Sequence, residues 1–191
     1  MNAKNLPKKV KRAIDKSVLI ATALLVWSFL PTVSQALLNK GEPAPSFKVK
    51  SGDDKEVTLD TIKGKTIVLF YETRDAIHNN KDLKKYLEML YNTQAKNTQK
   101  EIFRLVVINC MEATSLTTWK EKLVENSMKQ GITIYGDWTG DMFAAYRMKD
   151  NDTNFMIIDK RGIVRFAESG RIENGRFEEI RTLLLELTYG R

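Results

Sequence analysis

The stretch TIVLFYETRDAIH, residues 66–78, decides the fold of this chain. Residues 67–71 form a continuous apolar run bounded by polar residues. Such a run predicts a short central strand that is buried on both faces of a sheet. The residues that follow it, Glu72 to His78, are mostly polar and contain no cysteine. The sequence therefore predicts a buried strand that ends in a polar segment.

Strands and helices alternate on both sides of this run. On its N-terminal side, residues 47–49 and 56–59 flank Ser51-Gly52-Asp53-Asp54 and predict a short hairpin. On its C-terminal side, the spacing of apolar residues predicts a helix over about 80–95, a strand over 102–109, a helix over 116–129 closed by Gly131, a strand over 132–135, a short helix over 140–148, strands over 154–158 and 163–166, and a closing helix over 177–187. This order is typical of an α/β sandwich with a mixed sheet.

Several motifs resemble those of exported thioredoxin-like proteins of the TlpA and AhpC/TSA type. The lead-in VTLDTIKGK, residues 57–65, precedes the central strand, and FMIIDKRGIV, residues 155–164, matches a signature of that superfamily. Residues 136–146, GDWTGDMFAAY, and the tail after Gly162 are most similar to the periplasmic YtfJ group, whose members lack the active-site cysteines. The resemblance covers about residues 41–187. It implies a thioredoxin-like α/β/α sandwich with a mixed central sheet.

Asp75 and His78 stand where these relatives carry a Cys-x-x-Cys pair. Dithiol exchange needs one thiolate to attack and a second thiol to resolve the mixed disulfide, so this site is expected to be degenerate, with no catalytic residue. An aspartate beside a histidine could orient it for acid–base work, but no nucleophile or third group accompanies the pair. The alternative is that Asp75 caps a helix and His78 faces solvent.

A surface for binding is expected around the same segment. Thr153 stands where thioredoxins place a cis-proline that contacts bound peptide, and a cis bond before threonine is improbable. Trp138 lies between two acidic residues in a predicted loop and could anchor a partner. The candidate binding residues are Asp75, Ala76, Ile77, His78, Thr153 and Trp138.

Cys110 is the only cysteine, so no disulfide can form within the chain. It follows an apolar strand, where a cysteine is more often a small buried hydrophobe than a reactive thiol. The alternative is a single-thiol redox enzyme, a peroxidase or a partner-linked oxidoreductase, acting through Cys110. Glu72, Asp75, His78 and Cys110 together offer too few suitable ligands for a metal site, so neither a metal nor another cofactor is expected.

Residues 1–36 have the layout of a secretory signal peptide. Basic residues precede an apolar run of 14 residues, Ser17 to Leu30, and small residues precede the expected cleavage point after Ala36. An uncleaved membrane anchor is the alternative, although a span needs roughly 20 apolar residues. We expect a periplasmic protein with an extended lead over 37–45, a thioredoxin-like domain over 46–191, and no membrane span after cleavage.

The charge of the chain lies mostly in that leader. The whole chain carries 31 Lys and Arg and 24 Asp and Glu, a net charge of +7, and residues 1–36 contain six of the basic residues and one of the acids. The remainder therefore has 25 basic and 23 acidic residues and a net charge of +2. Because both signs are mixed along it, nucleic acid is not an expected partner. A protein partner or a small ligand is expected instead.

Overall fold

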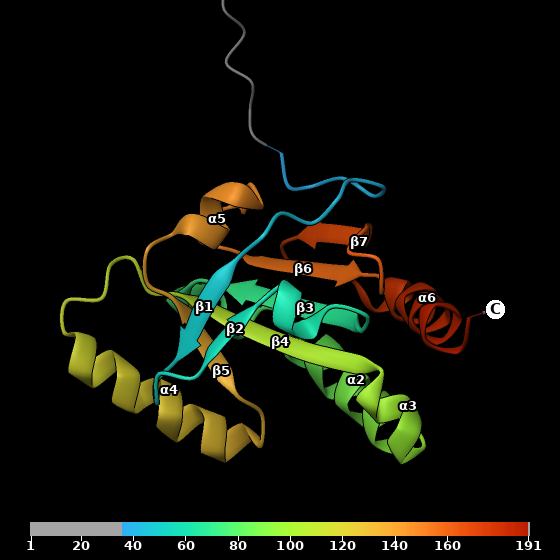
Figure 1. The fold of residues 1–191 in the computed structure, drawn as a ribbon, viewed down its shortest axis with the longest axis horizontal. Coiled ribbons are helices and arrows are strands. Elements are labelled where there is room, and N and C mark those ends of the chain that lie inside the picture. Colours follow the sequence, from blue (N-terminus) through green and yellow to red (C-terminus); the bar gives the residue numbers. More distant parts are fainter. Residues whose placement is uncertain (1–35, 191) are drawn as a thin grey trace, which may run out of the picture. The chain divides into compact units, whose positions relative to one another are not determined.

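The predicted central strand is β3, Thr66–Glu72, and all seven of its residues are buried (Figure 1). The computed structural model describes residues 36–190. Within them, β3 lies in a seven-stranded sheet of order β2-β1-β5-β4-β3-β6-β7. β4, Ile102–Asn109, runs parallel to β3 on one side, and β6, Thr153–Ile158, runs antiparallel on the other. The mixed sheet and the buried central strand are therefore confirmed.

The other four strands extend the sheet at both ends. β5, Ile134–Asp137, is parallel to β4. The predicted hairpin, β1 at Lys48–Ser51 and β2 at Glu56–Thr58, joins the sheet through β5. At the other end, β7, Val164–Ser169, pairs with β6. The parallel strands thus lie inside the sheet, and antiparallel strands close both of its ends.

Three long helices cover one face of the sheet: α2, Lys81–Thr93; α4, Leu116–Gln130; and α6, Phe177–Tyr189. α2 and α4 lie on the same face because β3, β4 and β5 follow one another in a single direction through right-handed crossovers. α6 packs beside α2, and a 3-10 turn, Asn174–Arg176, precedes it. Gly131 ends α4 with a φ of 62°, the left-handed conformation that glycine adopts without strain.

The opposite face is covered by shorter elements. These are the 3-10 turn Asp60–Ile62, α5 at Asp141–Ala145, and the chain over 37–47. The first part of that chain is tied to the start of β7, because Gly41 donates a hydrogen bond to the Val164 carbonyl at 2.8 Å. Leu38 in the same part of the chain is buried.

Alternate residues of β3 face the two layers. Ile67, Leu69 and Tyr71 join the cluster under the shorter elements, whereas Val68 and Phe70 pack against α2 and α6. Because both faces of β3 are covered, its sequence is a continuous apolar run.

The element boundaries differ from the predictions in a few places. The predicted helix over 80–95 ends at Thr93, and a separate short helix, α3 at Lys96–Lys100, follows. Gln99 accounts for the break, because its side-chain amide donates to the Tyr91 and Gln94 carbonyls at 3.1 Å each and so satisfies backbone groups at the end of α2. β5 begins two residues later than the predicted strand over 132–135.

The predicted signal peptide falls almost wholly outside the described residues, which begin at its last residue, Ala36. Among the helices that the structure does describe, none combines the length and the apolar character needed to cross a membrane.

Candidate functional site

The segment between β3 and α2, residues 73–80, is called the site loop here. It begins with a 3-10 turn, Arg74–Ala76, and continues as a turn to the start of α2 at Lys81. Asp75 and His78 are exposed, Ile77 is half-buried and Ala76 is buried. The expectation that Asp75 caps a helix is wrong, because α2 begins six residues later and has no side-chain cap.

A partly buried ion pair anchors the site loop. The Glu72 carboxylate, at the end of β3, is only 1% exposed, and the Lys84 ammonium of α2 lies 2.6 Å from its Oε2. The same ammonium donates to the Ile77 carbonyl at 3.0 Å, so it holds the loop as well as the strand. Burial raises the pKa of the Glu72 carboxyl above its ordinary value, and the charge of Lys84 offsets only part of that rise.

Thr153 supports the loop from inside the protein. Its side chain is fully buried, and its hydroxyl lies 3.0 Å from the Ala76 carbonyl and 3.3 Å from Glu72 Oε1. No cis peptide bond occurs among residues 36–190, so the bond before Thr153 is trans. The structure thus brings Thr153 and Ala76 together but leaves the threonine side chain facing the loop rather than solvent.

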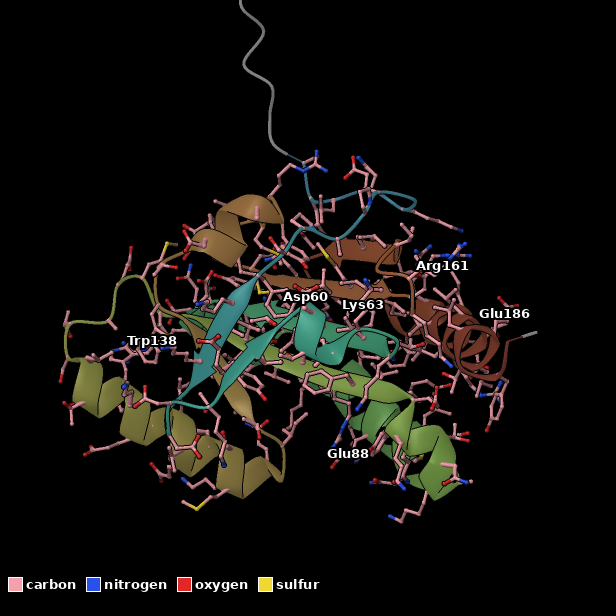
Figure 2. The ribbon with its side chains drawn as sticks, viewed as in Figure 1. Asp60, Lys63, Glu88, Trp138, Arg161 and Glu186 are labelled. Atoms are coloured by element: carbon pink, nitrogen blue, oxygen red, sulfur yellow. The ribbon has the colours of Figure 1, made fainter. Side chains whose placement is uncertain are left out.

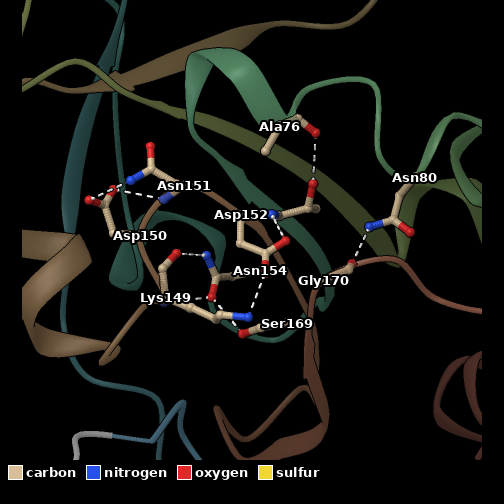
Figure 3. A network of polar contacts seen from close by, with 10 residues as sticks. Ala76, Asn80, Lys149, Asp150, Asn151, Asp152, Asn154, Ser169 and Gly170 are labelled. Carbon is tan, nitrogen blue, oxygen red and sulfur yellow. Dashed lines mark hydrogen bonds and ion pairs between the residues drawn. The ribbon is translucent and has the colours of Figure 1, made fainter.

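Backbone and amide contacts complete the support of the loop (Figure 3). The Asn80 side chain donates to the Gly170 carbonyl at 2.8 Å and accepts from the Ile172 amide at the same distance. The Thr73 amide donates to the Asp152 carbonyl at 3.3 Å. Both ends of the site loop are therefore fixed to the segments that flank β6 and follow β7.

Trp138, labelled in Figure 2, lies at the same edge of the sheet as the site loop but two strands away from it. It follows β5, its indole nitrogen donates to the Lys50 carbonyl of β1 at 3.2 Å, and it packs with Leu123 of α4. β4 separates β5 from the strand that carries the site loop. The structure therefore does not group Trp138 with the other candidate binding residues.

Cys110 is buried, as the apolar residues before it predict. Only 2% of the residue is exposed, and its amide donates to the Asp137 carbonyl at 3.0 Å. Burial raises the pKa of the thiol to about 12, and the nearby charge of Asp137 adds to the rise. The raised pKa disfavours the thiolate at neutral pH, and the thiolate is the nucleophilic form of cysteine.

A groove beside the site loop was not predicted from the sequence. It lies between α2 and α4 and has a volume of about 660 Å³. Its floor is apolar, with Val106 and Ile108 of β4 at its centre. Basic side chains border it: Arg74, Lys81, Lys84, Lys85 and Lys122. We call this feature the α2–α4 groove.

The sequence contained a weak signal for the ion pair but none for the groove. Glu72 directly follows an apolar strand, where a carboxylate needs a partner, and Lys84 adjoins the apolar face of the next helix. Neither residue by itself identifies the other. In the part of the chain from 36 to 190, no group of three or more His, Cys, Asp or Glu side chains could hold a metal ion.

The strand order, with one set of helices on each face, defines a thioredoxin-like fold. Solved structures with this fold include the thioredoxin domain of a thiol-disulfide oxidoreductase from Bacteroides vulgatus, with 16% identity, a TM-score of 0.57, and coverage of 77% of this chain and 99% of that one. The exposed lipoprotein thioredoxin of Streptococcus pneumoniae is 20% identical over 75% and 100% of the two chains, with a TM-score of 0.51. A thiol peroxidase from Chromobacterium violaceum is 14% identical over 79% and 88%, with a TM-score of 0.55.

The family follows from the sequence match. The model of the AhpC/TSA family matches residues 40–167, and this chain belongs to that family. A comparison with curated proteins finds no match.

Proposed function

We propose that this protein is an exported thioredoxin-fold protein of the YtfJ type that serves as a binding or accessory protein of the cell envelope and not as a thiol-disulfide oxidoreductase. One observation carries the proposal. The exposed positions of the site loop hold Asp75 and His78, while the single thiol, Cys110, is buried and has a raised pKa. A solvent-facing nucleophile is therefore missing where the fold would use one.

The site loop has the character of a fixed recognition surface. Its exposed residues Asp75 and His78 and the half-buried Ile77 stand on a backbone held by the Glu72–Lys84 pair and by Thr153. A rigid loop loses less conformational entropy on binding than a flexible one. In this proposal Ala76 and Thr153 position the loop, and Asp75, Ile77 and His78 contact a protein or small ligand.

Export rests on the N-terminal pattern. A basic segment, an apolar run and small residues before Ala36 favour cleavage there and a periplasmic location. The S. pneumoniae protein with the same fold is described as an exposed lipoprotein, which supports export but not a particular compartment. N-terminal sequencing of protein taken from the periplasm should give Leu37 as the first residue. A form that still carries residues 18–30 would instead show a membrane anchor.

The redox part of the proposal is tested by turnover. The purified protein should reduce insulin with dithiothreitol, and consume peroxide, no faster than buffer alone, because one exposed thiolate and a resolving thiol are both missing. The matched control is Cys110→Ser, which should give the same rates. Turnover that disappears in Cys110→Ser would establish the single-thiol enzyme instead. Turnover that survives in that variant would require a different chemistry at the site loop.

A further inference from the structure

β4 is an interior strand, yet only one of its faces is fully covered. Leu105 and Val107 are 0% exposed beneath the shorter elements. Val106 and Ile108, which point to the helical face, remain partly exposed. The neighbouring β3 differs, because its Phe70, the register partner of Val106, is buried under helices. The apolar surface of the sheet is thus open along β4.

The packing of the helices explains this opening. α2 packs on α6, whereas α4 packs on β5 and β1. The α2–α4 groove lies between these two helices, and Trp119 and Leu123 of α4 line it. Figure 1 shows the two helices apart from one another on either side of β4. Glu88 lies on the side of α2 that faces α4 (Figure 2). The volume of about 660 Å³ falls within the range of small-molecule sites, roughly 300–1,000 Å³.

The charges around the groove favour an anion. Lys84 is neutralised by Glu72. The other basic side chains of the border, Arg74, Lys81, Lys85 and Lys122, form no ion pair within the described part of the chain, and Glu88 is the one further acid that lines the groove. Lys81 and Lys85 are exposed and lie one helical turn apart on α2, so their charges reinforce one another. The border therefore offers uncompensated positive charge directly above an apolar floor.

The backbone and the size of the groove argue against two other occupants. β4 is hydrogen-bonded to β3 and β5 on both sides, so a peptide cannot add to it as a further strand. A stable protein interface buries roughly 1,200–2,000 Å² in all, so a protein would have to contact much more surface than the groove alone. A small molecule with an apolar part and an anionic group matches both the floor and the border.

We propose that the α2–α4 groove binds a single-chain amphipathic carboxylate, with its hydrocarbon tail on Val106, Ile108 and Trp119 and its carboxylate against Arg74, Lys81 and Lys85. The carboxylate lies at the end of the groove next to the site loop, since Ile108 is the register partner of Glu72. The inference rests on the proposed binding function and names its ligand class.

Calorimetric titration of the exported protein with monomeric dodecanoate tests the proposal. Dodecanoate should bind, and hexanoate should bind at least about a hundredfold more weakly, because each buried methylene strengthens binding about fourfold. The variant Lys81→Glu/Lys85→Glu should weaken dodecanoate binding at least about tenfold. Its matched control is Lys96→Glu/Lys100→Glu, which makes the same charge change at exposed positions of α3 and should bind as the wild type does.

The location of the ligand is tested by fluorescence. The brominated ligand 2-bromododecanoate carries its bromine beside the carboxylate, at the end of the groove where α4 begins and Trp119 lies. It should quench tryptophan emission, whereas dodecanoate should not, because a bromine atom quenches at short range. The quenching should be lost in Trp119→Phe. Val106→Phe, which narrows the floor without changing charge, should weaken binding at least about tenfold. If circular dichroism shows that this variant is unfolded, the comparison of hexanoate with dodecanoate still decides whether the tail is buried.

Three results would overturn the inference: no dodecanoate binding, equal weakening in the α3 control, or quenching that persists in Trp119→Phe. Binding only to anionic phospholipid vesicles, with none to monomeric dodecanoate, would also overturn it and indicate a membrane surface as the ligand. None of these results depends on insulin or peroxide turnover. The proposed ligand class and the proposed lack of redox activity can therefore be disproved independently of one another.

Discussion

The site loop and the loop that begins at Cys110 leave the same edge of the sheet, from the adjacent parallel strands β3 and β4. The first displays Asp75 and His78 to solvent. The second, residues 110–115, begins with Cys110, whose side chain is buried. The comparison shows that solvent exposure and the thiol are found in different loops. The exposed site loop has no cysteine, and Cys110 is buried.

The two loops are also held by different forces. The Cys110 amide bonds to the Asp137 carbonyl, and its side chain packs among apolar residues. The site loop depends on charge, since Lys84 bridges Glu72 and the Ile77 carbonyl. The site loop buries only Thr73, Ala76 and Asn80, and buried polar partners underneath satisfy its backbone groups.

The largest effect is expected from introducing two cysteines into the exposed site loop. Asp75→Cys/His78→Cys should form an intramolecular disulfide and raise insulin reduction at least about tenfold above background, because it supplies an attacking and a resolving thiol. Position 75 directly precedes, and position 78 lies within, a turn in which the Asn79 amide donates to the Ala76 carbonyl at 2.9 Å. Mass spectrometry of the oxidised protein and the insulin assay measure the result. Two free thiols in a folded protein under mild oxidant would show that these positions do not form a dithiol site.

Breaking the Glu72–Lys84 ion pair should have the next largest effect. Lys84→Met keeps much of the apolar stem but leaves the Glu72 carboxylate buried without its partner, so the free energy of unfolding should fall by about 3 kcal/mol. Guanidinium unfolding measures the change. The control Glu72→Gln/Lys84→Met removes both charges and should recover most of the loss. A loss below about 1 kcal/mol in the single variant would show that the pair does not anchor the loop.

A substitution in the loop that begins at Cys110 should have a smaller effect on stability. Cys110→Ser should lower the free energy of unfolding by about 1–2 kcal/mol, since it places a hydroxyl where the thiol packs among apolar groups. In the wild type, a thiol reagent should label folded Cys110 at least about a hundredfold more slowly than unfolded protein. Rapid stoichiometric labelling of the folded form would mean that this loop opens. The two loops would then not differ in the accessibility of their reactive positions.

The Glu72–Lys84 ion pair should also make the free energy of unfolding depend on pH. The pKa of Glu72 is raised in the folded protein, so its contribution to stability is present below the unfolded pKa and is lost as the pH rises through the folded pKa. The wild type should therefore lose stability relative to Glu72→Gln as the pH rises above about 4.5. Unfolding curves of both proteins across that range test this, and a constant difference would exclude the effect.

The smallest effect is expected at the exposed residues themselves. Asp75→Ala and His78→Ala should each change the free energy of unfolding by no more than about 0.5 kcal/mol, because both side chains are exposed. Thermal unfolding measures this directly. A loss above about 1 kcal/mol in either variant would give that residue a structural role in the loop, contrary to the assignment made here.

Much of the fold could be predicted from local patterns. The run over 67–71 and the helical spacing of Leu83, Leu87, Ile180 and Leu184 place their own residues in the core. Each pattern reflects burial of the residues that form it, so it can be read without knowledge of the partner. The break between α2 and α3 escaped prediction, because it depends on Gln99 reaching back to Tyr91 and Gln94.

The candidate site was less accessible to such reasoning. The alignment of Asp75 and His78 with a Cys-x-x-Cys pair came from resemblance, and the burial of Cys110 followed from the apolar residues before it. The α2–α4 groove depends on how two helices diverge across β4, and periodicity does not encode that divergence. The pairing of Lys84 with Glu72 likewise depends on a tertiary contact between a helix and a strand.

The attachment of the N-terminal chain has a consequence for the order in which the protein folds. Gly41 and Ala44 are hydrogen-bonded to Val164 and Gly162, and β1 pairs with β5. A ribosome makes these early residues long before their partners emerge, so they cannot be fixed until most of the chain is available. Residues 41–51 can therefore reach their native contacts only late in synthesis or after it.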